Sequence, residues 1–427
     1  MERDALAVVP EAAPVVGRPP RSGGAFRALR VAAFRRYFAG QVVSASGTFV
    51  QQTALAWAVL NMTGSASKLG LVLASGGVPY LLFGPLGGRL VDRVDNRRLL
   101  LATQACYGLL AVALWLLASA GRLSIPLIVS LSVAGGFVQI ADSPARLAFV
   151  GQLVPAPDLA SAVSLNGVIM NSSRVIGPAV AGLLIVEVGT TPCFAVNAVS
   201  YALVLLALAT IHPSVPARSG PARGGVGEAL SYVRGHQQLY LPLAMMALVG
   251  LVAFNFNVAL PLLAKDTYHG GGGTYGLLSV LLSIGSVAGS LAVGMIGHPR
   301  RRYLLGSSLA FGACLALAAA APNVATGGIA LLLTGFSGYL LVTMASTALQ
   351  LHADPAYRGR VMALWVFVYL GTTPVGNILA GWLSAAEGPR AVLLAGAVSC
   401  LAAAGLAARV HTPPDVDAEF RVTPTVR

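Results

Sequence analysis

Charge is scarce in this chain of 427 residues. Only 10% of the residues are charged, against about 25% in a soluble protein, while 56% are hydrophobic. Acidic residues are the scarcer kind, 15 against 28 basic ones, which gives a net charge of +13. The basic residues form short clusters between apolar runs, as loops at a membrane surface do. The composition predicts an integral membrane protein that sits in a lipid bilayer and has no nucleic-acid partner.

Several kinds of chemical site are missing as well. The four cysteines, Cys106, Cys193, Cys314 and Cys400, are scattered without ligand spacing, which argues against a metal or redox centre. No phosphate-binding Lys-Ser/Thr loop is present, so ATP is not the expected energy source. No Ser/His/Asp set or pair of carboxylates stands out, and residues 1–30 lack the apolar core of a signal peptide. We therefore expect a protein that is not an enzyme and uses no cofactor.

Long apolar segments make up most of the chain. About 20 such residues can cross a bilayer, and the connections are short enough that neighbouring segments should be antiparallel. With the N-terminus inside, the inner side would hold 23 basic residues and the outer side 4, which favours a cell membrane protein with both termini in the cytoplasm. Twelve segments can be drawn: 37–60, 69–90, 99–119, 124–146, 160–186, 190–211, 239–263, 275–297, 303–321, 325–349, 360–385 and 390–409.

The densest group of charges lies between the second and third segments. Its members are Arg89, Asp92, Arg93, Asp95, Arg97 and Arg98. Together with Gly88, this stretch resembles the loop between helices 2 and 3 of the major facilitator superfamily of transporters. Asp95 and Asn96 replace the usual Gly-Arg, but both residues suit a turn. The resemblance implies an all-α fold of twelve membrane helices in two pseudo-symmetric halves, with this loop as a conformational lock.

Internal repeats indicate that the chain consists of two related halves. Gly70 and Gly276 are related by a shift of 206 residues, as are Gly88 and Gly294, while Gly182 and Gly381 are related by a shift of 199. Pseudo-symmetric halves around a midplane cavity are typical of transporters. The predicted organisation is a cytoplasmic tail (1–36), a six-helix half (37–211), a cytoplasmic linker rich in Pro, Gly and Arg (212–238), a second six-helix half (239–409) and a cytoplasmic tail (410–427).

The fifth segment contains the sequence NSSRVIGPAVAG at residues 171–182. It resembles the drug/proton antiporter motif at Gly177, Pro178 and Gly182. Pro178 removes a backbone hydrogen bond and should kink the helix. We expect the small residues to let this segment pack on a neighbour, the eighth segment of the other half. Ordinary small-residue packing without a transport role is the alternative.

Arg174 lies inside that motif, near the middle of its segment. An arginine there costs at least about 2.5 kcal/mol and usually faces a cavity or a partner. It could bind an anionic or strongly polar group of a substrate, or couple transport to protons. A structural role as donor to helix carbonyls or to Asn and Ser side chains is the alternative.

Further charges are candidates for gating. Asp142 and Arg146 are spaced to pair along a helix, and Asp142 is either a proton acceptor or a gate charge. With residues 193–201 (CFAVNAVSY), they resemble the branch of the superfamily that includes the enterobactin exporter. Residues 129–136 lack the helix 4 arginine of many drug antiporters, which argues against the usual proton-coupling scheme. The turn with Arg358 and Arg360 resembles the gate of the second half.

Helices 1 and 7 line the cavity in this superfamily, so the resemblance implies substrate contacts there. The polar candidates on these two helices are Gln51, Gln52, Asn255 and Asn257. The candidates for an aromatic wall around a bulky amphipathic ligand are Trp57, Phe254, Phe256, Trp365 and Tyr369. Hydrogen bonding between helices, or packing and lipid contact for the aromatic residues, is the alternative for each.

The sequence as a whole predicts a monomeric secondary transporter. It would export a small, largely apolar or amphipathic compound, such as a drug, natural product or siderophore-like molecule, by proton antiport with alternating access. The proton gradient would be the driving force. An importer of a small polar or anionic solute, with Arg174 as its ligand, is the second hypothesis, and a membrane sensor that transports nothing is the third.

Overall fold

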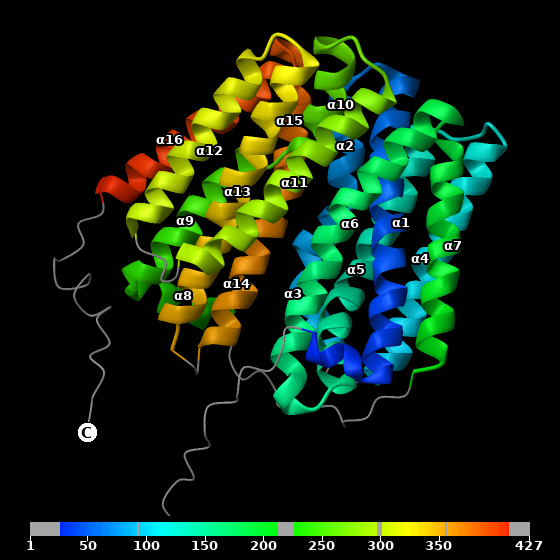
Figure 1. The fold of residues 1–427 in the computed structure, drawn as a ribbon, viewed down its shortest axis with the longest axis vertical. Coiled ribbons are helices and arrows are strands. Elements are labelled where there is room, and N and C mark those ends of the chain that lie inside the picture. The colour runs from blue at the N-terminus through cyan, green and yellow to red at the C-terminus, as the bar shows by residue number, and fades with distance from the viewer. Residues whose placement is uncertain (1–25, 92–93, 212–225, 297–300, 355–356, 410–427) are drawn as a thin grey trace, which may run out of the picture.

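A computed structural model describes residues 26–91, 94–211, 226–296, 301–354 and 357–409. These residues form helices and no β-strand, arranged as two bundles (Figure 1). The N-terminal bundle contains η1 (Arg27–Arg30), α1 (Ala32–Thr63), α2 (Ala66–Ser75), α3 (Val78–Val91), α4 (Asn96–Ser119), α5 (Ile125–Leu153), η2 (Ala156–Asp158), α6 (Leu159–Glu187) and α7 (Thr191–Ala209). The C-terminal bundle contains α8 (Val226–Gly235), α9 (Gln237–Val252), α10 (Phe256–Leu262), η3 (Leu263–Thr267), α11 (Gly272–Ile296), α12 (Arg301–Ala320), α13 (Val324–His352), α14 (Arg358–Gly371), α15 (Thr373–Glu387) and α16 (Pro389–Arg409).

Eleven helical segments of the described residues are long and apolar enough to cross a membrane. α1 is not one of them, although its 32 residues exceed the about 20 that a crossing needs. Polar side chains such as Gln41, Gln51 and Gln52 lower its hydropathy. α1 runs beside α6 and α7 through the N-terminal bundle (Figure 1). The all-helical membrane fold is therefore confirmed. The expected number of twelve membrane spans is reached only if α1 is counted as a crossing helix as well.

Three of the expected spans are each divided into two helices. The first break separates α2 from α3 at Gly76 and Gly77, and another separates α14 from α15 at Thr372. These two breaks meet, because a Cβ placed on Gly77 would lie 2.6 Å from the ring of Pro374. The third break, at residues 253–255, separates α9 from α10. Helices interrupted inside the membrane commonly surround the binding sites of transporters.

Two pairs of helices join the bundles through glycines. A Cβ on Gly182 of α6 would lie 3.0 Å from the Cα of Gly276 on α11. A Cβ on Gly381 of α15 would likewise lie 3.0 Å from the Cα of Gly70 on α2. Backbones approach this closely only where no side chain intervenes. The expected packing of the fifth segment on the eighth is confirmed, and the second seam repeats it with the halves exchanged.

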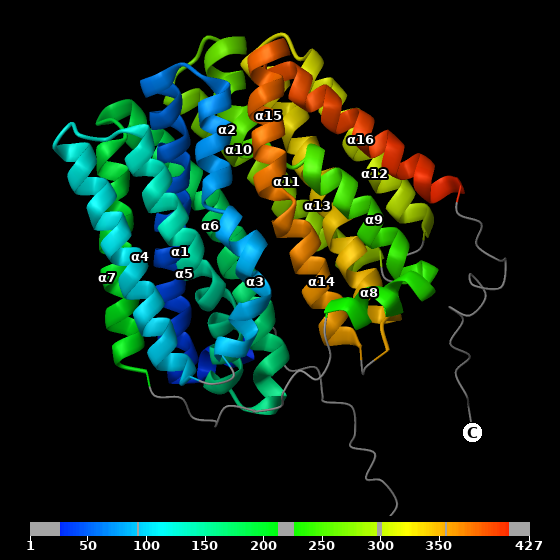
Figure 2. The same cartoon turned by 180° about the vertical axis from the view of Figure 1, so that it is seen from behind.

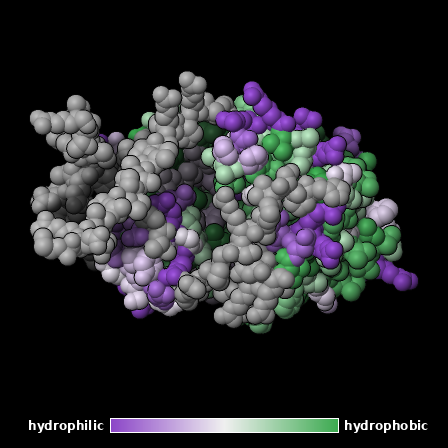
Figure 3. Space-filling model, turned by 90° about the horizontal axis from the view of Figure 1, so that it is seen from below, coloured by the Kyte–Doolittle hydropathy of each residue, from purple (hydrophilic) through white to green (hydrophobic). Residues whose placement is uncertain are grey.

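The bundles meet at the upper end of Figure 1 and diverge at the lower end, as the reverse view in Figure 2 also shows. At the upper end the ring of Trp57 stacks on that of Tyr275, with centroids 6.1 Å apart. Lys265 there donates to the carbonyl of Leu60 at 3.4 Å and to Asn61 Oδ1 at 3.3 Å. Seen from the lower end, hydrophilic residues gather on both bundles around a hollow (Figure 3). None of the ion pairs in the described residues joins the two bundles.

The region expected to be a linker, 212–238, contains the helix α8, while residues 212–225 lie outside the described residues. α8 packs against the start of α14. The rings of Tyr232 and Tyr357 stack with centroids 4.2 Å apart, and Glu228 pairs with Arg360 at 3.0 Å. The end of the linker is therefore an ordered part of the C-terminal bundle. The expected tail 1–36 likewise ends in helix, because α1 already begins at Ala32.

Candidate functional site

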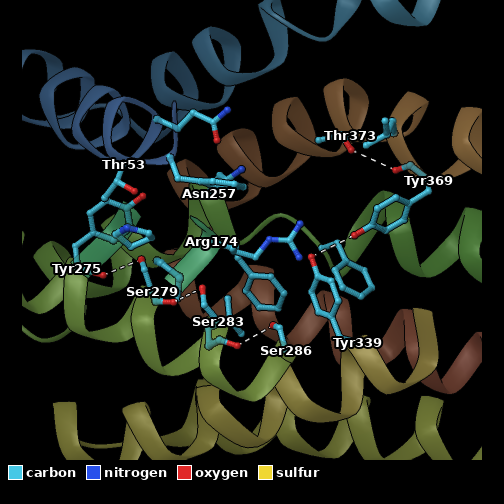
Figure 4. Close-up of a pocket in the computed structure, with 18 residues that line it drawn as sticks. Thr53, Arg174, Asn257, Tyr275, Ser279, Ser283, Ser286, Tyr339, Tyr369 and Thr373 are labelled. Carbon is cyan, nitrogen blue, oxygen red and sulfur yellow. Dashed lines mark hydrogen bonds between the residues drawn. The ribbon is translucent and has the colours of Figure 1, made fainter. Parts of the chain in front are cut away.

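A cavity of about 240 Å³ lies between the two bundles. Five of its 18 lining residues come from α1 and α6 of the N-terminal bundle, and 13 come from the C-terminal bundle. The wall consists of Phe49, Gln52, Thr53, Arg174, Pro178, Phe254, Phe256, Asn257, Leu260, Tyr275, Ser279, Leu282, Ser283, Ser286, Tyr339, Tyr369, Leu370 and Thr373 (Figure 4). Both halves contribute, so any movement of one bundle against the other changes this space.

Arg174 is the one charged residue in that wall. It lies one turn before Pro178 on α6, and its side chain extends toward Tyr339 and Tyr369 of the other bundle (Figure 4). The guanidinium carbon is 4.8 Å from the centre of the Tyr339 ring and 5.9 Å from that of Phe49. Aromatic faces attract a cation, but more weakly than a carboxylate does. The structure thus places Arg174 in a cavity that has no acidic side chain in its wall.

Three of the other predicted residues also line the cavity: Gln52, Asn257 and Pro178. Gln52 comes from α1 and Asn257 from α10, which correspond to the expected segments 1 and 7. The aromatic candidates Phe254, Phe256 and Tyr369 are part of the wall as well. Trp57 is not, because it stacks on Tyr275 closer to the upper end.

Three predicted polar or aromatic contacts lie outside the wall. Gln51 faces α7, where its Oε1 accepts a hydrogen bond from Asn197 at 2.7 Å. Asn255 is buried in the break between α9 and α10, and its amide donates to the carbonyls of Leu251 and Val252. Trp365 stacks behind Tyr369, with centroids 6.1 Å apart and planes at 3°. The structure gives these three side chains packing and capping contacts, and their role in substrate binding stays a prediction.

A row of serines also lines the cavity, and none of them is among the residues expected from the sequence. Ser279, Ser283 and Ser286 lie along the cavity side of α11 (Figure 4). Each hydroxyl donates to a carbonyl four residues earlier, at 2.8, 2.7 and 2.8 Å, so the oxygen lone pairs stay available. Their spacing of four and three residues, which marks one helix face, is the signal that could have found them. Tyr339 had no such signal, because a single tyrosine in an apolar segment does not reveal which way it points.

Asp142 and Arg146 pair as their spacing predicts, at 2.7 Å. Asp142 is only 5% exposed. Its Oδ1 accepts hydrogen bonds from Thr103 at 2.8 Å and from Gln104 at 2.7 Å, both on α4. Arg146 also donates to Gln41 of α1. The pair is therefore the centre of a buried polar network that ties α1, α4 and α5 together within one bundle.

The loop between α3 and α4 is described in part. Gly88 lies in α3, and Asp92 and Arg93 lie outside the described residues. Asp95 caps α4 by accepting the backbone N–H of Arg98 at 2.8 Å. Arg97 donates to the carbonyl of Ala209 at 2.8 Å, at the end of α7, where a cation complements the helix dipole.

The second bundle repeats this arrangement. Arg301, at the start of α12, donates to the last carbonyls of α16, including Ala408 at 3.1 Å. Arg358 begins α14, and Arg360 forms the ion pair with α8. Gly177 of the α6 motif packs on Phe49 of α1 in its own bundle, whereas Gly182 packs on the other bundle. The gating roles of these residues stay predictions.

Comparison with known proteins agrees with the architecture. Residues 23–423 match the model of a family described as transmembrane secretion effector. The staphyloferrin A transporter of Staphylococcus aureus (strain NCTC 8325 / PS 47) is 25% identical over 80% of this chain and 87% of its own length. The enterobactin exporter EntS of Shigella boydii serotype 18 (strain CDC 3083-94 / BS512) is 26% identical over 90% of this chain and 95% of its own length.

A solved structure shares the fold. The crystal structure of a bacterial homologue of the human lysosomal transporter Spinster superposes with a TM-score of 0.73 and 14% identity, over 88% of this chain and 97% of that one. The resemblance inferred from the charged loop and the α6 motif is confirmed by a family match that spans almost the whole chain. The chain belongs to the transmembrane secretion effector family, an efflux branch of the major facilitator superfamily.

Proposed function

We propose that this protein exports a small amphipathic compound across the cell membrane by alternating access, in exchange for protons. One observation carries the proposal: a cavity is lined by both bundles, which touch each other at the upper end and diverge at the lower end. Rocking one bundle against the other would open the upper end and close the lower one. A drug, a natural product or a siderophore-like molecule is the proposed substrate, in keeping with the names of the relatives.

The lower end of Figure 1 is the proposed cytoplasmic side. α1 begins there and α7 ends there, and Arg97, Arg98, Arg301 and Arg360 lie at that end. Positive charge concentrates on cytoplasmic loops. In this orientation the cavity would load from the cytoplasm, as export requires.

Asp142 is the proposed proton carrier. It is the one buried acid among the described residues, and the cavity wall holds none. A proton on Asp142 would remove the charge that holds Arg146 and would loosen the link from α5 to Gln41 of α1. The energy is sufficient, because one charge crossing 100 mV supplies about 2.3 kcal/mol.

Direction and coupling can be measured together. Susceptibility of cells with and without the gene to a broad compound panel identifies a substrate. Inside-out vesicles should then accumulate that substrate when their interior is made acidic, and a protonophore should abolish the accumulation. Accumulation in right-side-out vesicles instead would show that the protein imports its solute. Equal susceptibility across the panel, with no flux in either vesicle type, would contradict transport.

A further inference from the structure

We infer that the cavity binds its substrate through an anionic group, a carboxylate, held against Arg174. The inference rests on the proposed transport function and specifies the class of compound. Of the 18 side chains in the wall, one is a cation and none is an acid. A cavity with a single positive charge complements a ligand with a single negative charge.

The contacts of Arg174 leave its charge without a negative partner. Its neighbours in the other bundle and on α1 are Tyr339, which offers it both a ring and a hydroxyl, and the ring of Phe49; none of these is an anion. None of the three ion pairs in the described part of the chain includes it. An arginine at membrane depth is stabilised far better by a carboxylate, which accepts two parallel N–H bonds from the guanidinium. A bound carboxylate would supply that partner, and a cationic ligand at the same place would be repelled.

The rest of the wall defines the other parts of the ligand. Phe254 and Tyr369, whose ring centroids are 6.0 Å apart, form an aromatic surface beside Arg174 that suits an apolar ring. Ser279 and Ser283 use their hydroxyl protons within α11, so they present acceptor oxygens to the cavity. The ligand that fits has a carboxylate at one end, an apolar body, and an N–H or O–H donor toward α11.

Three probes with one ring system separate charge from shape: 2-naphthylacetate, 2-naphthylacetamide and 2-(2-naphthyl)ethylamine. Binding to the purified full-length chain at pH 7 would be measured by isothermal titration calorimetry. We expect the acetate to bind at least tenfold more tightly than the amide, and the amine to bind most weakly. Arg174→Gln should bring the acetate within twofold of the amide, while Arg174→Lys should keep part of the preference.

Arg390→Gln is the matched control. Arg390 donates to the carbonyl of Ala321 at 3.0 Å and does not line the cavity, so its loss should leave the order of the probes unchanged. If Arg174→Gln does not remain monodisperse, the inference is tested on the wild type and on Arg174→Lys alone. The wild type must then already show the tenfold preference for the acetate.

The inference is overturned if the wild type binds the acetate no better than the amide, if it binds none of the probes, or if a folded Arg174→Gln keeps the preference. A failure of the proposed function looks different: the anion preference would be present, but no gradient-driven flux would accompany it. Gradient-driven export of neutral compounds without any anion preference would instead contradict this inference alone.

Discussion

The guanidinium of Arg174, on α6, lies 4.8 Å from the centre of the Tyr339 ring on α13, so the single cation of the cavity rests on an aromatic ring of the opposite half. The contact spans the boundary between the two bundles. Under the proposed alternating access it would persist in only part of a transport cycle, because the bundles would change their relative position. The contact of Tyr339 with Arg174 would therefore depend on the relative position of the bundles as well as on the charge in the cavity.

Removing that ring should change stability measurably. Tyr339→Leu takes away a cation–π contact of about 0.5–2 kcal/mol, so the unfolding temperature in detergent should fall. Tyr339→Phe keeps the ring face but loses the hydroxyl, which lies 3.4 Å from that of Tyr369, so its unfolding temperature should lie between those of the parent and the Leu variant. Equal unfolding temperatures for Leu and Phe variants would show that the ring does not stabilise Arg174.

The seam between α6 and α11 should not tolerate a methyl group. A Cβ on Gly276 would lie 2.6 Å from the Cα of Gly182, a backbone atom that cannot rotate away. Gly276→Ala should therefore cost about 1–3 kcal/mol and reduce flux per molecule. Gly294→Ala on the same helix is the control, because nothing lies within 4 Å of its added Cβ. If Gly276→Ala and Gly294→Ala have the same unfolding temperature and the same flux per molecule, the seam does not exclude a methyl group.

The stability of the protein should depend on both members of the buried Asp142–Arg146 pair on α5. Asp142→Asn leaves Arg146 charged and without its carboxylate, which should cost about 3–5 kcal/mol. The double variant Asp142→Asn/Arg146→Gln removes both charges and should recover much of the stability. Thermal unfolding of the two variants tests this. A double variant as unstable as the single one would mean that the hydrogen bonds to α4 matter more than the charge pair.

Accessibility tests the orientation of the chain. Lys68 and Arg98 are both exposed and lie near opposite ends of the N-terminal bundle. In a chain without native cysteines, Lys68→Cys should react in intact cells with a reagent that cannot cross the membrane. Arg98→Cys should react only after the cells are opened. The reverse pattern would place the termini outside the cytoplasm.

Much of the fold follows from the sequence because apolar runs and clustered arginines mark spans and loops directly. The breaks inside spans do not, since a glycine pair such as Gly76 and Gly77 leaves the hydropathy unchanged. α8 was missed because its ten residues depend on Tyr357 and Arg360, which lie more than a hundred positions away in the chain.

Within the site, the sequence could name residues but not the direction in which they point. Gln51 and Gln52 are adjacent, yet one bonds to α7 and the other lines the cavity, because successive side chains on a helix are rotated by about 100°. Arg174 was identifiable because its charge has few acceptable positions in a membrane. The direction in which an uncharged polar side chain points depends on which helices pack beside it. Those neighbours are known only from the folded structure.

In the proposed rocking movement, the glycine seams would determine how far the lower end of the bundles opens. Gly182 is 23 residues from the lower end of α6 at Leu159, a lever of roughly 35 Å at 1.5 Å per residue. A turn of 10° about that point would move the lower end by about 6 Å while the seam itself shifts very little. Gly70 and Gly381 form the matching close contact on α2 and α15, so in the proposed rocking movement both seams would lie near the axis of rotation while the lower end moves. Small rearrangements between bare backbones there would be amplified into the width of the entrance.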